Sequence, residues 1–235
     1  DMRETYLPAF EALVREAKVE AVMGAYNRTN GEPCCASETL LVDILRDEWD
    51  FDGHVTSDCW AIRDIWLHHK VASGPEEGVA MAVKAGCDLN CGEAYLYLLS
   101  AVEQGYIDEA TIDQSVRRLM LTRMRLGMFD PPEMVPYTQI PYSVNDSEEH
   151  RALALEVARE SMVLLKNDRG ALPLQAGLKI AVIGPNADDA EVLVGNYSGT
   201  PSRSVTPLQG IRAAAMRHSA SVEYAQGSAL LDPDE

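Results

Sequence analysis

The sequence lacks a long hydrophobic run, since no apolar stretch approaches the roughly 20 residues that a membrane span needs. Positive charge is also scarce: 20 lysines and arginines face 37 aspartates and glutamates, a formal net charge of −17. A surface of this sign repels nucleic-acid phosphates. We therefore expect neither a membrane nor a nucleic acid as a partner.

Two common kinds of site are also missing. The neighbouring His68 and His69 have no carboxylate or cysteine at the spacing that would complete a metal site, and no CxxC pair is matched by a second. An odd number of cysteines in a chain of 235 residues suggests mostly reduced thiols. The loop after Ile183-Gly184 lacks the later glycines of a dinucleotide-binding fingerprint. We expect no metal and no nucleotide here. The five cysteines are Cys34, Cys35, Cys59, Cys87 and Cys91.

What is present is an alternation of helical and strand-like segments. Apolar residues three and four apart predict helices, and short apolar runs bounded by turn signals predict strands. The predicted helices cover residues 6–18, 61–67, 75–85, 95–104 and 112–126, with one more that begins after a Ser37 cap. The predicted strands cover residues 19–26, 54–57 and 87–90.

This order is typical of an α/β fold with a parallel sheet and covering helices. A closed eight-stranded barrel needs about 250 residues, so residues 1–128 correspond at most to the C-terminal part of a TIM-like (β/α)8 barrel. Residues 129–147 are rich in proline and are interpreted as a linker. An amphipathic helix over 148–166 and a strand over 179–184 predict the start of a second α/β unit in 148–235.

Asp58 is the first candidate for a catalytic group. It follows the predicted strand 54–57 and precedes the predicted helix 61–67. The carboxyl end of a parallel strand is where α/β barrels place their chemistry. Tyr26, at the end of the preceding strand, belongs to the same rim. A second reading stays open, because an aspartate before a helix also serves as an N-cap.

Motifs along nearly the whole chain resemble those of glycoside hydrolase family 3, the β-glucosidase and β-xylosidase family. They occur in the order of that family. The matching segments are RETYLPAF (3–10), VMGAYN (22–27), NG (30–31), LR (45–46), FDG (51–53), SD (57–58), AGCD (85–88), RLG (125–127), ES (160–161) to Asn167, LPL (172–174) and 180–186.

The resemblance implies a barrel-like catalytic domain followed by a linker and an α/β sandwich domain. It also implies that Asp58 is the nucleophile, and that Met23 and Tyr26 line the sugar subsite. Many members carry tryptophan directly after the nucleophile, whereas this chain has Cys59 and then Trp60. That pattern is more similar to the β-xylosidase branch, and it adds Cys59 and Trp60 to the expected substrate-binding residues.

The implied activity is that of a retaining exo-β-glycosidase, which cleaves terminal β-glucosides or β-xylosides with two carboxylates and no cofactor. The resemblance places a Lys-His substrate-binding pair before residue 1 and the acid/base glutamate beyond Glu235. We therefore expect an internal piece of a longer enzyme, whose partner is the remainder of its own polypeptide and which is inactive alone. The alternative is a non-catalytic carbohydrate-binding fragment. Cytoplasmic and secreted locations both stay open.

Cys59 and Cys91 follow two successive predicted strands at the same rim. Neighbouring parallel strands lie about 5 Å apart, so we expect these two cysteines to be close in space and to border the sugar subsite. A disulfide requires Cα atoms within about 7 Å, and the sequence leaves the bonded and reduced forms both open.

Overall fold

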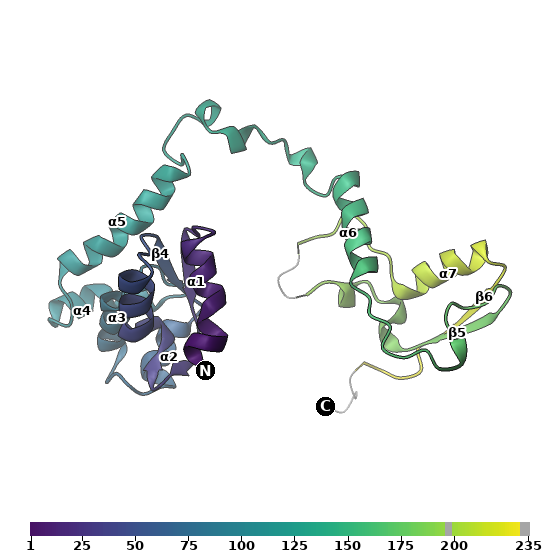
Figure 1. Ribbon diagram of the computed structural model, residues 1–235, viewed down its shortest axis with the longest axis horizontal. Coiled ribbons are helices and arrows are strands. Elements are labelled where there is room, and N and C mark those ends of the chain that lie inside the picture. The colour runs from purple at the N-terminus through teal and green to yellow at the C-terminus, as the bar shows by residue number, and fades with distance from the viewer. Residues whose placement is uncertain (196–198, 231–235) are drawn as a thin grey trace. The chain divides into compact units, whose positions relative to one another are not determined.

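The structure is a computed structural model that describes residues 1–195 and 199–230. The chain divides into two units, Asp1–Ile140 and Pro141–Glu235, and each is described by itself (Figure 1). The division falls inside the segment interpreted as a linker.

The first unit contains the expected alternation of strands and helices. Its strands are β1 (Ala21–Gly24), β2 (Arg28–Thr29), β3 (Glu32–Pro33) and β4 (His54–Ser57). Its α-helices are α1 (Leu7–Arg15), α2 (Ala61–Leu67), α3 (Pro75–Lys84), α4 (Leu98–Glu103) and α5 (Glu109–Arg125). Two segments have π-type hydrogen bonding, η1 (Met2–Tyr6) and η3 (Thr39–Glu48). Short 3-10 turns are η2 (Cys34–Ala36), η4 (Ala94–Tyr97), η5 (Pro132–Met134), η6 (Pro136–Gln139) and η7 (Tyr142–Val144), the last of which lies in the second unit.

The strands that position the site are parallel. β1 pairs with β4 so that Met23 lies opposite Thr56 and Gly24 opposite Ser57. On its other side β4 meets the chain at a single parallel bridge, Thr56 to Leu89. β4 is therefore the central strand, and the two neighbouring segments end at the same edge as it does.

The strand predicted over 87–90 is wrong in extent, because only that bridge forms. The reason is local. The Val55 N–H, which a regular ladder would direct to a backbone carbonyl, donates instead to the Asp88 carboxylate at 2.9 Å. A side chain thus takes the place of a strand partner.

The core of the first unit surrounds β4. Val55 is fully buried, as are Ile62 and Ile65 on α2 and Val79 on α3. The two helices pack against each other beside the strand. Their apolar residues recur at helical spacing, so one face of each helix is removed from water and stabilises the fold by burial.

The chain after β1 turns sharply, which shortens the strand predicted over 19–26. β2 and β3 form a two-residue hairpin around Asn30-Gly31, with φ values of 52° and 96°. Asn-Gly is the preferred pair for a turn that needs positive φ at both positions. The predicted turn is confirmed, and the Ser37 cap is too, since its hydroxyl accepts the Leu40 N–H at 3.0 Å.

The second unit contains α6 (Glu148–Glu160), β5 (Lys179–Ile183), α7 (Pro207–Arg217) and β6 (Ser221–Ala225), with short turns η8 (Asp168–Gly170), η9 (Pro185–Asp188) and η10 (Glu191–Leu193). β5 and β6 are parallel, with Lys179 opposite Ser221. α7 begins with a capping box in which Thr206 and Gln209 satisfy each other's backbone N–H groups. β5 is confirmed as the strand predicted over 179–184, whereas α7 and β6 were not predicted.

The helix predicted over 148–166 is too long, since α6 ends at Glu160. Met162, Val163, Leu164 and Leu165 follow as consecutive apolar residues, a pattern without helical period. All of these side chains are exposed in the structure. No helix among the described residues is long and apolar enough to cross a membrane.

Candidate active site

Asp58 stands directly after β4, and backbone hydrogen bonds hold this strand end on both sides. Its N–H donates to the Gly24 carbonyl of β1 at 3.0 Å. On the opposite side the Ser57 N–H donates to the Leu89 carbonyl at 2.8 Å. The Asp58 backbone is thus tied to the central strand and, through it, to both neighbours.

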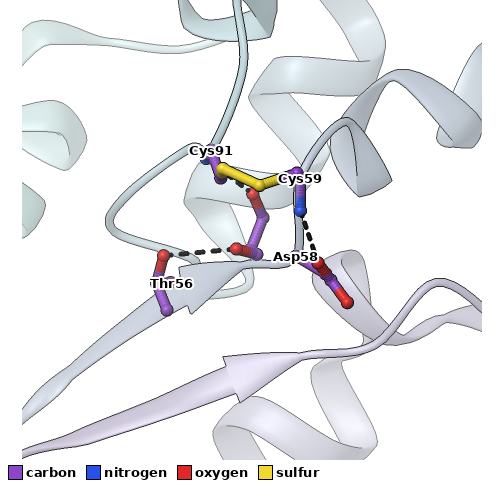
Figure 2. The surroundings of a disulfide bond; sticks show 5 residues. Thr56, Asp58, Cys59 and Cys91 are labelled. Atoms are coloured by element: carbon purple, nitrogen blue, oxygen red, sulfur yellow. Dashed lines mark hydrogen bonds between the residues drawn. A yellow bond between two sulfur atoms is a disulfide. The ribbon is translucent and has the colours of Figure 1, made fainter. Parts of the chain in front are cut away.

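The Asp58 carboxylate is oriented by the next peptide group. Its Oδ1 accepts the Cys59 N–H at 2.7 Å (Figure 2). The side chain is partly buried. Among the residues that the structure describes, this contact orients the carboxylate and engages one of its two oxygens. Asp58 is not the N-cap of α2, a position that Trp60 occupies without a side-chain cap, but its carbonyl accepts the Ala61 N–H at 3.1 Å and so closes the turn before the helix.

Cys59 and Cys91 form a disulfide, with Cα atoms 4.4 Å apart. The predicted closeness of these residues is confirmed, and of the two forms that the sequence left open the structure contains the disulfide rather than two reduced thiols. Figure 2 shows the bond directly beside Asp58. The Cys91 N–H donates to the Ser57 hydroxyl at 3.0 Å. The segment after Leu89 is therefore fastened to the end of β4 by a covalent bond.

Trp60 adopts a left-handed backbone conformation, with φ 65° and ψ 0°. This region is uncommon for a bulky residue and often marks a functional constraint. The Trp60 N–H donates to the Cys91 carbonyl at 2.7 Å, and a side chain on Gly92 would approach the indole to 3.3 Å. The indole is 54% exposed. The loop thus presents an aromatic face to solvent next to Asp58.

Met23 and Tyr26 come from the neighbouring strand. Met23 lies opposite Thr56 in the register, and its side chain is exposed. Tyr26 follows the end of β1, with an exposed ring and a carbonyl 2.9 Å from His69 Nε2. The structure therefore brings both residues to the same sheet edge as Asp58. Their contact with a sugar stays a prediction.

A cavity of about 600 Å³ lies beside β1, and Asp58 is not among its lining residues. Its walls come mainly from α1, η3 and β1, and most are apolar, such as Phe10, Leu41 and Trp49. Met23 and Gly24 are also among the lining residues. The chemistry of this cavity differs from that of the Asp58 edge, and we do not regard it as the active site.

A second carboxylate is fully buried beneath β4. Asp88 Oδ2 lies 3.1 Å from Arg46 Nη2, and Asp88 Oδ1 lies 2.9 Å from Arg118 Nη1. Burial and the nearby charge of Arg118 lower the pKa of Arg46, while the charge of Asp88 opposes this. Since Asp88 also accepts the Val55 N–H, one buried side chain joins η3, β4 and α5. No role was predicted for Asp88 from the sequence, although an aspartate within an apolar segment was the available signal.

Three cysteines remain as free thiols, and all three are buried: Cys34, Cys35 and Cys87. Among the described residues, no group of three or more histidine, cysteine, aspartate or glutamate side chains is placed to hold a metal ion. The expectation that no carboxylate has helical spacing to the pair His68 and His69 is wrong, because Asp64 precedes His68 by four residues and its Oδ1 lies 3.7 Å from His68 Nε2.

The comparison with known families decides the assignment. Residues 1–122 match the model described as the glycosyl hydrolase family 3 N terminal domain, and residues 162–230 match that of the family 3 C-terminal domain. The chain belongs to glycoside hydrolase family 3. The resemblance seen in its motifs is thereby confirmed.

Relatives with assigned names are similar along most of this chain. A xylan 1,4-beta-xylosidase from Xylanibacter ruminicola is 45% identical over 91% of the chain, which corresponds to 25% of that protein. A probable beta-D-xylosidase 7 from Arabidopsis thaliana is 42% identical over 90% of the chain and 28% of its own length. The chain thus spans between a quarter and a third of the relatives it matches.

Solved structures agree with this assignment. A family 3 exo-beta-xylosidase, XlnD, in complex with a xylobiose aziridine activity-based probe, superposes with a TM-score of 0.87 at 35% identity. The match covers 98% of this chain and 30% of that one. A β-glucosidase from Erythrobacter marinus gives 0.83 at 36% identity, over 97% and 30% of the two chains. The mixed α/β fold is that of the family.

Proposed function

We propose that the polypeptide containing this chain is a retaining exo-β-glycosidase and that Asp58 is its nucleophile. The observation that carries the proposal is the position of Asp58. It ends the central parallel strand of a family 3 unit, with one carboxylate oxygen held by the Cys59 N–H at 2.7 Å. A carboxylate fixed in this way can direct its second oxygen toward an anomeric carbon.

The proposed reaction has two steps. An Asp58 oxygen bonds to the anomeric carbon while the glycosidic C–O bond breaks, and a protonated carboxyl group gives its proton to the departing oxygen. The oxygen of a water molecule then bonds to the anomeric carbon while the bond from that carbon to Asp58 breaks, and the same carboxyl group, now ionised, takes a proton of the water. We assign this acid/base role to no residue of this chain.

The sugar subsite is proposed to lie over Asp58, between Met23 and Tyr26 on one side and Trp60 with the disulfide on the other. The indole supplies an apolar face against which a sugar ring can stack. The relatives named as β-xylosidases favour a β-xyloside, and the β-glucosidase structures keep a β-glucoside as the second candidate.

The finer architecture is part of the same proposal. We interpret residues 1–128 as the C-terminal part of a (β/α)8 barrel, 129–147 as a linker and 148–235 as the start of an α/β sandwich domain. Parallel β1 and β4, each followed by helical segments, support the first assignment. Parallel β5 and β6 with α7 between them support the last.

Trapping of the glycosyl-enzyme tests this function. The complete polypeptide is incubated with a 2-deoxy-2-fluoro-β-xyloside or the matching glucoside, which slows the second step. We expect a mass increase of one fluorosugar on the peptide that contains Asp58, and none in an Asp58→Asn variant. A folded protein that binds the sugar but never becomes labelled would favour the non-catalytic carbohydrate-binding alternative.

A further inference from the structure

The thiol of Cys35 lies against the end of β1. Cys35 belongs to the turn η2 and is 1% exposed. Its Sγ lies 3.7 Å from the Ala25 carbonyl oxygen, to which the thiol donates. A Cβ added to Gly24 would lie only 2.8 Å from the same sulfur. The sulfur therefore occupies the space that a side chain at position 24 would need.

Backbone conformation does not explain the glycine at this position. Gly24 is not among the residues with positive φ, so its dihedral angles suit any residue. The close approach of Cys35 is the remaining reason, since the Cys35 Cα lies within 3.4 Å of the added Cβ as well. Gly24 and Cys35 are a complementary pair, in which the larger residue requires the smaller one.

This pair lies next to Asp58 in space. The Gly24 carbonyl accepts the Asp58 N–H at 3.0 Å, and Gly24 is in register with Ser57. The Cys87 thiol lowers the pKa of Cys35, burial raises it, and the Asp58 backbone N–H lowers it further. The residue against which the Cys35 sulfur packs, Gly24, is thus the one that holds the Asp58 N–H.

We propose that Cys35 is a positioning residue, whose packing against Gly24 sets the distance between β1 and the Asp58 backbone. This inference rests on the proposed function of Asp58. Displacing the Gly24 carbonyl moves the group that holds the Asp58 N–H, and the carboxylate moves with it. A misplacement of about 1 Å at a reacting group can lower a rate about 10²-fold.

A double-mutant cycle in the complete polypeptide tests the inference. Gly24→Ala puts a methyl group where the sulfur lies. We expect the rate of Asp58 labelling by the fluorosugar, and kcat, to fall about 10- to 100-fold with little change in KM. Cys35→Ala removes the sulfur and is expected to cost less than about 10-fold. In the double variant the methyl group fits, so labelling should return to within a few-fold of Cys35→Ala.

Gly195→Ala is the matched control, because no atom of the described, non-adjacent residues lies within 4 Å of a Cβ at that position. Equal losses for Gly24→Ala with and without Cys35 would overturn the inference, as would wild-type labelling of Gly24→Ala. If Gly24→Ala does not fold, the labelling rate of the double variant is compared with that of Cys35→Ala. Similar labelling rates support the inferred role of the pair, and a 10-fold or greater loss in the double variant rejects it. A wild-type protein that is not labelled on Asp58 would instead reject the proposed function.

Discussion

At the scale of single residues, Asp58 combines a structural and a proposed chemical role. Its N–H pairs with β1 and its carbonyl accepts the Ala61 N–H, while its carboxylate accepts the Cys59 N–H. The helix-cap reading of the sequence is wrong, because Trp60 is the residue before α2 and that helix has no side-chain cap. The backbone of Asp58 holds the turn before the helix, and its carboxylate stays available for chemistry.

Asp58→Asn should separate these roles. The amide keeps the size of the side chain but cannot form a covalent glycosyl-enzyme, so we expect a loss of turnover on the order of 10³-fold or more. Steady-state kinetics of the complete polypeptide measure the loss, and circular dichroism checks the fold. Asp43→Asn, at an exposed position of η3, is the control and should retain activity. Activity near that of the wild type in a folded Asp58→Asn variant would contradict the assignment.

Asp88→Ala is expected to lower stability strongly. It leaves the Arg46 and Arg118 cations without their buried partner and the Val55 N–H without an acceptor. Removing one member of a buried ion pair costs about 3–5 kcal/mol. The midpoint of denaturant unfolding measures the effect, and Asp113→Ala on the exposed side of α5 should change it little. Equal midpoints for the two variants would show that the buried pair is not required.

At the scale of elements, the disulfide joins the end of β4 to the segment that follows Leu89. Hydrogen bonds already connect these parts through Ser57 and Trp60. The covalent bond closes a loop with a sequence separation of 32 residues. It therefore restricts the unfolded chain as well as the position of Trp60 beside Asp58.

A Cys59→Ser/Cys91→Ser variant should lose both stability and activity. Opening a loop of this length typically costs about 2–4 kcal/mol. We expect a lower thermal midpoint and a lower kcat for the complete polypeptide. Reductant should reproduce the effect in the wild type and have no further effect on the variant. If reductant lowered the thermal midpoint and kcat equally in both proteins, these losses would not come from this disulfide.

At the scale of the whole molecule, the two units bury very different amounts of apolar side chain. The first unit has a continuous core around Val55, Ile62 and Val79. In the described part of the second unit, Leu208 and Ala215 are the buried apolar residues. Apolar residues of α6, including Leu153, Leu155 and Val157, are exposed. We expect the remainder of the polypeptide to cover these exposed apolar side chains.

We therefore expect the 235-residue chain, expressed alone, to be poorly stable. Exposed strand edges and apolar faces promote association. The chain should bind a hydrophobic dye or aggregate, and the complete polypeptide should do neither under the same conditions. Dye fluorescence and thermal melts compare the two proteins. A sharp cooperative melt of the monomeric chain would contradict this expectation.

The sequence by itself was enough to predict β4 and α2, the Asn30-Gly31 turn, the Ser37 cap and the membership in glycoside hydrolase family 3. The elements, the turn and the cap depend on residues close together in the chain, where periodicity and turn chemistry act directly. The family membership follows instead from the resemblance of motifs spread over nearly the whole chain. The strand-end position of Asp58 follows from the same local signals. The predicted closeness of Cys59 and Cys91 needed only one further premise, that parallel strands end at the same edge.

The tertiary structure alone decided the features that depend on residues far apart. Asp88 replaces a strand partner because Arg46 and Arg118 reach it from other elements. Position 24 requires glycine because a sulfur eleven positions later in the chain fills the space beside it. Such contacts depend on how the elements pack against one another. The sequence around one residue of a contact therefore does not predict which distant residue it will meet.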